Sequence, residues 1–74
     1  MNYIEVTLLW GDRLAIQKDT ITAVREFTGP PSKDLVKQYP FLKGVDYCVW
    51  MSSSFSGDIF CKDSYEDIMQ QLRD

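Results

Sequence analysis

A chain of 74 residues has room for one small domain; 26% of its residues are charged and its net charge is −3. The sequence has no concentrated basic face for nucleic acid, and no segment approaches the ~20 apolar residues of a membrane-spanning helix. We therefore expect one compact domain over residues 1–74 that binds neither nucleic acid directly nor membrane. No signal peptide is recognisable, which predicts a cytoplasmic protein with reduced cysteines.

The first predicted elements are strands. Residues 3–9 are rich in β-branched and aromatic types and alternate apolar side chains on one face. Gly11 provides a turn, and residues 13–17 form the return strand of a hairpin. Residues 21–27 are compatible with a strand or a short helix, and their three β-branched residues favour a third strand.

Residues 28–44 interrupt this pattern. Pro30 and Pro31 have no backbone N–H, so no sheet ladder continues through them. Ser32 is a residue type that begins helices, and the residues after it predict one or two helical turns that Pro40 ends. Because long connections in small domains are uncommon, we expect this excursion to be either a functional element or a mobile one.

The second half of the chain predicts two more strands and a helix. The strands cover residues 45–51 and 58–62, and residues 63–74 form an amphipathic helix that Asp63 or Ser64 caps. Its apolar positions recur at the spacing of one helix face: Tyr65, Ile68, Met69 and Leu72. The order β-β-β-short α-β-β-α predicts an α+β fold, a small, strongly bent antiparallel sheet of about five strands with the C-terminal helix packed on it.

The composition argues against an enzyme. The chain contains no histidine, which is the commonest general base near neutral pH and the commonest metal ligand. Two cysteines alone do not complete a zinc site, and the four glycines are isolated turn residues rather than a phosphate-binding loop. We therefore expect no catalytic, cofactor-binding or metal-binding residues, and no cofactor.

Cys48 and Cys61 lie on the two strands that we expect to pair. If the intervening turn centres on residues 54 and 55, the cysteines are cross-strand neighbours, near enough for a disulfide under oxidation. A change of one residue in the turn separates them. In a reducing compartment we favour the other interpretation, two buried free thiols.

Aromatic residues provide the candidate partner-binding positions. Trp10 and Phe55 lie at predicted turns, and Tyr39 and Phe41 lie in the excursion over residues 28–44. Exposed aromatic side chains at such places are typical anchors for a protein partner. The alternative is that they fold back and cover an open side of a small core.

Two stretches near the ends of the chain carry a family resemblance. They are Ile4-Glu5-Val6-Thr7-x-Leu9-x-Gly11 followed by Ile16-x-x-Asp19-x-Ile21-x-x-Val24, and Ile59-Phe60-Cys61-Lys62-Asp63-Ser64-x-Glu66-x-Ile68. Both resemble the FlbD-like family of small flagellar proteins. The resemblance implies a non-enzymatic accessory protein with no catalytic residues to transfer. The sequence departs from the family pattern in its insertion at residues 28–44 and in its many aromatic residues.

These observations support two hypotheses on function. The first is a non-catalytic interaction or accessory module that binds another protein, or a second copy of itself as a homodimer, through the aromatic turn residues and the excursion. The alternative is an inhibitor of phage or mobile-element type that occludes a nucleic-acid-handling enzyme with its acidic half, since residues 44–74 carry a net charge of −4 and residues 1–43 one of +1. The inhibitor would be favoured if four acidic side chains cluster on one surface, namely those of Asp46, Asp58, Glu66 and Asp67.

Overall fold

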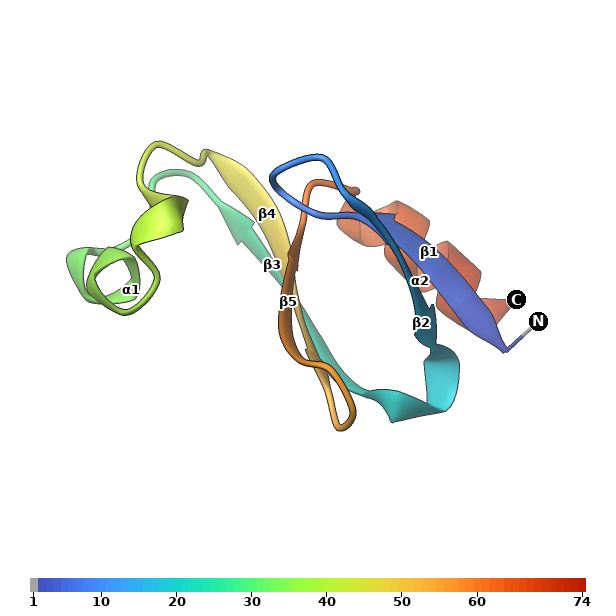
Figure 1. The fold of residues 1–74 in the computed structure, drawn as a ribbon. Helices are drawn as coiled ribbons and strands as arrows, with labels where there is room; N and C mark the ends of the chain where they lie inside the picture. Colours follow the sequence, from blue (N-terminus) through green and yellow to red (C-terminus); the bar gives the residue numbers. More distant parts are fainter. Residues whose placement is uncertain (1) are drawn as a thin grey trace.

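A computed structural model describes residues 2–74 of the chain (Figure 1). The elements are β1 (Tyr3–Thr7), β2 (Arg13–Gln17), β3 (Ile21–Thr28), α1 (Lys33–Gln38), β4 (Tyr47–Ser53), β5 (Gly57–Cys61) and α2 (Tyr65–Arg73), with short 3₁₀ helices at Lys18–Thr20 and Pro40–Leu42. The predicted α+β class and element order are confirmed. Within the described residues, neither helix is long and apolar enough to cross a membrane.

The strands form two antiparallel sheets that join at one corner. β1 pairs with β2, and β3, β4 and β5 form the second sheet in that order. Beyond β1 the chain runs alongside β5, where Leu8 forms a bridge with Cys61 and the Leu9 N–H donates to the Phe60 carbonyl over 3.2 Å. The continuous strand order is therefore β2-β1-β5-β4-β3, the strongly bent arrangement that the sequence predicts (Figure 1).

Both α-helices begin at a serine. The Ser32 hydroxyl accepts from the Leu35 N–H, and the Ser64 hydroxyl accepts from the Asp67 N–H, each over 3.1 Å. These bonds satisfy backbone donors that have no partner inside the first helical turn. The sequence therefore predicted the start of both helices. For α2 it offered Asp63 or Ser64 as the capping residue, and the structure shows Ser64.

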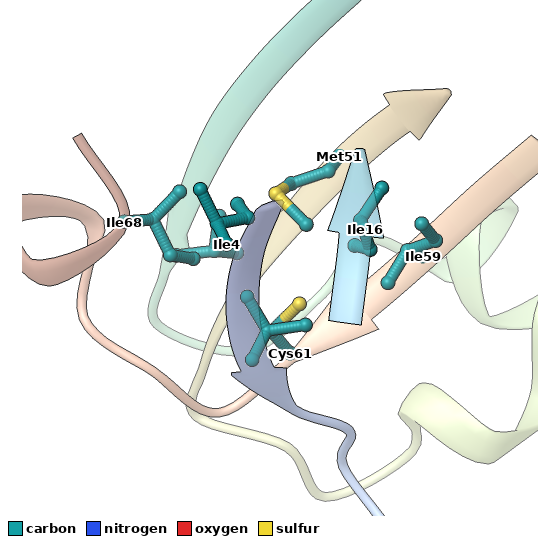
Figure 2. Close-up of a cluster of buried hydrophobic side chains, with 8 residues drawn as sticks. Ile4, Ile16, Met51, Ile59, Cys61 and Ile68 are labelled. Carbon is teal, nitrogen blue, oxygen red and sulfur yellow. The ribbon is translucent and has the colours of Figure 1, made fainter. Parts of the chain in front are cut away.

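An inner core fills the space between the two sheets and α2. Its buried side chains come from the inward face of each element: Ile4, Val6, Ile16, Val49, Met51, Ile59, Cys61 and Ile68. Figure 2 shows Ile68 extending from α2 toward Ile4, with Ile16 and Ile59 farther along the cluster. Burial of each large apolar side chain contributes about 1.5–3 kcal/mol, so this cluster holds the two sheets and α2 together.

A second, outer cluster lies on the opposite face of the β3–β4–β5 sheet. Leu42, Cys48 and Phe60 are buried there, and Tyr39 and Trp50 pack against them. The excursion over residues 28–44 thus covers part of this face. This is the second of the two roles that the sequence allows its aromatic residues, the covering of an open side of a small core. Its helix α1 lies at the far end of the molecule from α2 and both termini (Figure 1), and the long axis of the molecule measures 37 Å.

The cysteine register differs from the conditional expectation by one residue. Val49, not Cys48, lies opposite Cys61, because the turn is centred on residue 55 and Ser53 pairs with Gly57. Gly57 adopts a φ of 77°, which favours glycine at the end of this turn. Cys48 consequently lies in the outer cluster and Cys61 in the inner core. The condition for the cross-strand placement is therefore not met, and both cysteines are buried free thiols in the structure.

Candidate functional site

Four large apolar side chains among residues 2–74 are strongly exposed, and all four border two adjoining grooves. Trp10 (60% exposed) and Phe41 (47%) line the first, and Tyr3 (56%) and Phe55 (89%) line the second. Each groove has a volume of about 390 Å³. We call them the aromatic groove and the edge groove. They adjoin because Leu14 and Ser56 line both.

Rings from three separate parts of the chain build the aromatic groove. Trp10 of the β1–β2 turn meets Phe41 of the excursion edge to face, with ring centroids 5.9 Å apart. Phe41 and Tyr39 both pack on Phe60 of β5, at 5.1 Å and 4.9 Å. Such aromatic pairs add about 0.5–1.5 kcal/mol each beyond their buried area, so the groove wall is preformed and stiff.

The ring network continues beneath the groove across the outer face of the sheet. Trp50 stacks on Phe60 at 5.2 Å and on Phe27 at 5.7 Å. The Arg25 guanidinium lies 5.7 Å from the Trp50 ring centroid, within the range of a cation–π interaction. The excursion, β3, β4 and β5 are therefore tied together by one aromatic layer.

Asp58 places a carboxylate at the side of the aromatic groove. It accepts hydrogen bonds from the Tyr39 hydroxyl (3.0 Å) and from Trp50 Nε1 (3.1 Å). Partial burial, and after it the hydrogen bond and negative charge of Asp58, raise the pKa of Tyr39. Among residues 2–74 the one ion pair joins Arg13 and Glu5, so Asp58 has only neutral donors there.

The turn that carries Phe55 is fixed by a buried hydroxyl. Ser53 Oγ accepts from the N–H groups of Phe55 (3.2 Å) and Ser56 (3.1 Å), and it donates to Thr20 Oγ1 (3.0 Å). The Ser54 N–H donates to the Thr20 carbonyl over 2.7 Å. The turn thus holds Phe55 beside β2 although the phenyl ring itself is exposed.

The structure brings the four predicted binding residues to one side of the molecule. Trp10, Tyr39 and Phe41 meet in the aromatic groove, and Phe55 borders the edge groove next to it. Tyr39 also belongs to the cover of the outer cluster, so it serves both roles that the sequence left open.

Sequence reasoning missed Tyr3, and it named Asp58 only among the acidic residues of the inhibitor hypothesis, not as part of an aromatic site. Tyr3 precedes the alternating apolar residues of β1, and its phase in that pattern places it on the outward face, which was a usable signal. Asp58 follows a glycine at the start of a strand, and nothing in the sequence distinguishes it from an ordinary turn residue. Its role depends on hydrogen bonds with Tyr39 and Trp50, which are distant in the chain.

No group of three or more cysteine, aspartate or glutamate side chains within the described residues 2–74 is placed to hold a metal ion. Comparison of the chain with family models, with curated proteins and with solved structures finds no match. The FlbD-like resemblance therefore stays a prediction.

Proposed function

We propose that this chain is a non-catalytic interaction module that binds another protein through the aromatic and edge grooves. One observation carries the proposal: the four strongly exposed large apolar side chains all border these two adjoining grooves. Contiguous exposed apolar surface is costly in water and marks interaction sites, and aromatic residues dominate the energetics of such sites.

The stiffness of the groove supports the same function. Trp10, Phe41 and Phe60 pack on one another without a partner, so few rotamers remain to be ordered on binding. Each rotamer-rich side chain that is immobilised costs about 0.5–1.5 kcal/mol, and a preformed site avoids much of that cost. An accessory role in the cytoplasm, as the sequence suggests, is consistent with a small protein that acts by docking.

The acidic-inhibitor hypothesis has weaker support because Asp58 lies apart from Glu66 and Asp67. Asp58 bonds to Trp50 on the outer face of the sheet, whereas Glu66 and Asp67 lie in the first turn of α2, which packs on the inner core. A nucleic-acid mimic needs its charges on one face to imitate a phosphate backbone.

Affinity capture from cells that express the protein tests the proposal. The unaltered chain is compared with the Trp10→Ala and Phe41→Ser double variant, by quantitative mass spectrometry of the bound proteins. Truncation of a central aromatic anchor costs about 2 kcal/mol or more, which is about 30-fold in affinity. We expect the double variant to lose the proteins that the unaltered chain enriches.

Val36→Ser is the matched control, because Val36 is a half-buried apolar residue of α1 that lines neither groove. This variant should capture the same proteins as the unaltered chain. Capture of the same set by a correctly folded double variant would contradict the proposal. Loss of the set on reversal of Glu66 and Asp67 to lysine would favour the inhibitor instead.

A further inference from the structure

The outer edge of β2 has unused backbone hydrogen-bonding groups. In an antiparallel ladder, hydrogen-bonded residue pairs alternate with pairs that are not hydrogen-bonded. Two hydrogen bonds show which pairs of the β1–β2 hairpin are of the first kind. The Lys18 N–H donates to the Asn2 carbonyl and the Leu8 N–H donates to the Asp12 carbonyl, each over 2.7 Å. On β2, the N–H and C=O groups of the even-numbered residues therefore point toward β1. The corresponding groups of the odd-numbered residues point away from β1, and these residues are Arg13, Ala15 and Gln17.

The outer edge of β1, by contrast, is covered. The Gln71 side chain of α2 donates to the Glu5 carbonyl and accepts from the Glu5 N–H, each over 2.9 Å. Farther along, the Lys62 N–H donates to the Thr7 carbonyl over 2.9 Å. Among the outward backbone groups of β2, a side chain satisfies only the Gln17 carbonyl, which accepts a hydrogen bond from the Thr20 hydroxyl. β3 is the other edge strand, and none of the four exposed aromatic side chains lines a groove beside it.

The two grooves follow strand edges rather than strand faces. Residues 14–17 of β2 all line the edge groove, although consecutive side chains of a strand point to opposite faces. A groove that touches all four must run along the edge. Residues 58–60 of β5 line the aromatic groove in the same way. The open space therefore lies between the edges of β2 and β5, where a bent sheet would accept one more strand.

The charge on the grooves is complementary to a basic side chain. Asp58 is the one charged residue that lines them within the described part of the chain, and its hydrogen-bond donors are neutral. Trp10 and Phe41 stand beside it with exposed rings, which attract a cation through their π faces. An arginine or lysine at this end would gain both interactions.

We propose that the grooves bind one extended segment of a partner protein, which adds to the edge of β2 as a new strand. Its side chains at alternate positions are apolar and fill the grooves, and a lysine or arginine side chain reaches Asp58. This proposal rests on the proposed function and specifies the chemistry of the partner. Main-chain bonds supply part of the affinity in such strand addition, and the pockets for alternate side chains supply the specificity.

A second copy of the chain fits this site less well. Pairing of β2 with β2 would satisfy the backbone groups, yet the strand has no free large apolar side chain to insert. Ile16 is buried in its own core at 3% exposure, and Leu14 is half-buried against it. The remaining side chains are those of Arg13, Ala15 and Gln17, which would leave the grooves empty.

Selection from a random dodecapeptide library displayed on phage provides the probe. We expect the enriched peptides to contain one lysine or arginine and apolar residues at alternate positions. In the complex with an enriched synthetic peptide, amide hydrogen exchange at Ala15 and Gln17 should slow at least 10-fold. Exchange at Leu14 and Ile16, which are already bonded to β1, should change little. This alternation distinguishes strand addition from docking of side chains alone.

Two substitutions test the edge. Ala15→Pro removes an outward N–H from β2, and Thr28→Pro removes an outward N–H from the free edge of β3 as the matched control. Ala15→Pro should weaken peptide binding at least 10-fold and Thr28→Pro should leave it unchanged. Equal binding by a folded Ala15→Pro variant would overturn the proposal; if that variant does not fold, the exchange measurement on the unaltered chain decides.

Asp58→Asn tests the charge. It should weaken the binding of a peptide that contains lysine or arginine at least 10-fold. In this variant, replacing the basic residue of the peptide by alanine should cause no further loss of affinity. If the Asp58→Asn change and the alanine replacement lower the affinity independently and additively, the assigned contact is overturned.

The remaining outcomes separate the two proposals. Peptides that bind the grooves without slowing exchange at Ala15 and Gln17 overturn strand addition and leave the proposed function intact. Protection of these amides in a dimer without peptide assigns the edge to a second copy. No enrichment above the Trp10→Ala and Phe41→Ser double variant overturns binding of an extended segment, and the affinity capture then decides the proposed function separately.

Discussion

Ser53 shows how one hydroxyl determines the position of a binding residue. It is the buried polar side chain of the described chain, at 6% exposure, and its oxygen joins the β4–β5 turn to Thr20. Ser53→Ala would leave the N–H groups of Phe55 and Ser56 without this acceptor. We expect a loss of about 1–3 kcal/mol in the free energy of unfolding, measured by urea denaturation.

Ser54→Ala is the control for this prediction, since Ser54 is exposed and uses only its backbone N–H. It should change the free energy of unfolding by less than about 0.5 kcal/mol. Equal stability of the two variants would contradict the role assigned to Ser53.

Cys61 predicts a loss of stability in alkali. Burial, followed by the negative charges of Asp63 and Cys48, raises the pKa of the Cys61 thiol from 9.0 to about 12. Below pH 9 the thiol is protonated in both states and its contribution to stability is fully present. Between pH 9 and 12 only the unfolded chain ionises, so the free energy of unfolding falls as the pH rises.

Urea denaturation at pH 8, 9, 10 and 11 measures this effect, with Cys61→Ala for comparison. The difference between the unaltered chain and the variant should shrink as the pH rises, because the variant has no thiol at this position. Tyr39, Tyr47 and Cys48 also have raised pKa values, and all three remain in the variant, so their own titrations contribute to both curves. Parallel curves would contradict the prediction.

At the scale of elements, α2 is held by one fully buried side chain. Ile68 is 0% exposed within the inner core, whereas Met69 and Leu72 on the same apolar stripe are half-buried. Ile68→Ala should cost about 2–4 kcal/mol, as is typical of buried large-to-small changes. Chemical denaturation measures it, and Gln70→Ala on the exposed side of α2 should be nearly neutral. An unchanged denaturation midpoint for Ile68→Ala would contradict the docked helix.

The sequence located the elements better than it located their register. β2 covers the predicted residues 13–17, because alternation and a glycine turn are local signals. β4 begins at Tyr47 rather than at residue 45, because the Val45 N–H donates to the Leu42 carbonyl at the end of the excursion. The register of β4 on β5 depends on a turn conformation that the side-chain pattern does not encode, so the sequence could place the two cysteines opposite each other only under a condition that the observed turn does not meet.

At the scale of the whole molecule, the excursion is part of the folded structure. Leu42 is 1% exposed, and the excursion shields the outer cluster around Cys48 and Phe60. Replacing residues 30–42 by a short glycine linker should therefore lower the free energy of unfolding by more than about 3 kcal/mol, or produce self-association through the uncovered face. Thermal melting and sedimentation velocity measure the two effects. A stable monomeric deletion variant would contradict this role.

The candidate site illustrates the limit of prediction at this scale. Trp10, Tyr39, Phe41 and Phe55 were recognisable because large aromatic residues at turns and in long connections are unusual. Their convergence was not recognisable, since it requires the β1–β2 turn to meet the excursion across β5. That meeting depends on the bend between the two sheets, which is a property of the packed inner core rather than of any single segment.

The placement of the two tryptophans gives the molecule a built-in optical reporter. Trp10 stands at 60% exposure on the rim of the aromatic groove, while Trp50 is stacked between Phe27 and Phe60 and bonded to Asp58. The emission of Trp10 therefore responds to what enters the groove, and that of Trp50 responds to loss of the fold. A Trp50→Phe variant would isolate the first signal, so that occupancy of the groove can be followed by fluorescence without a label.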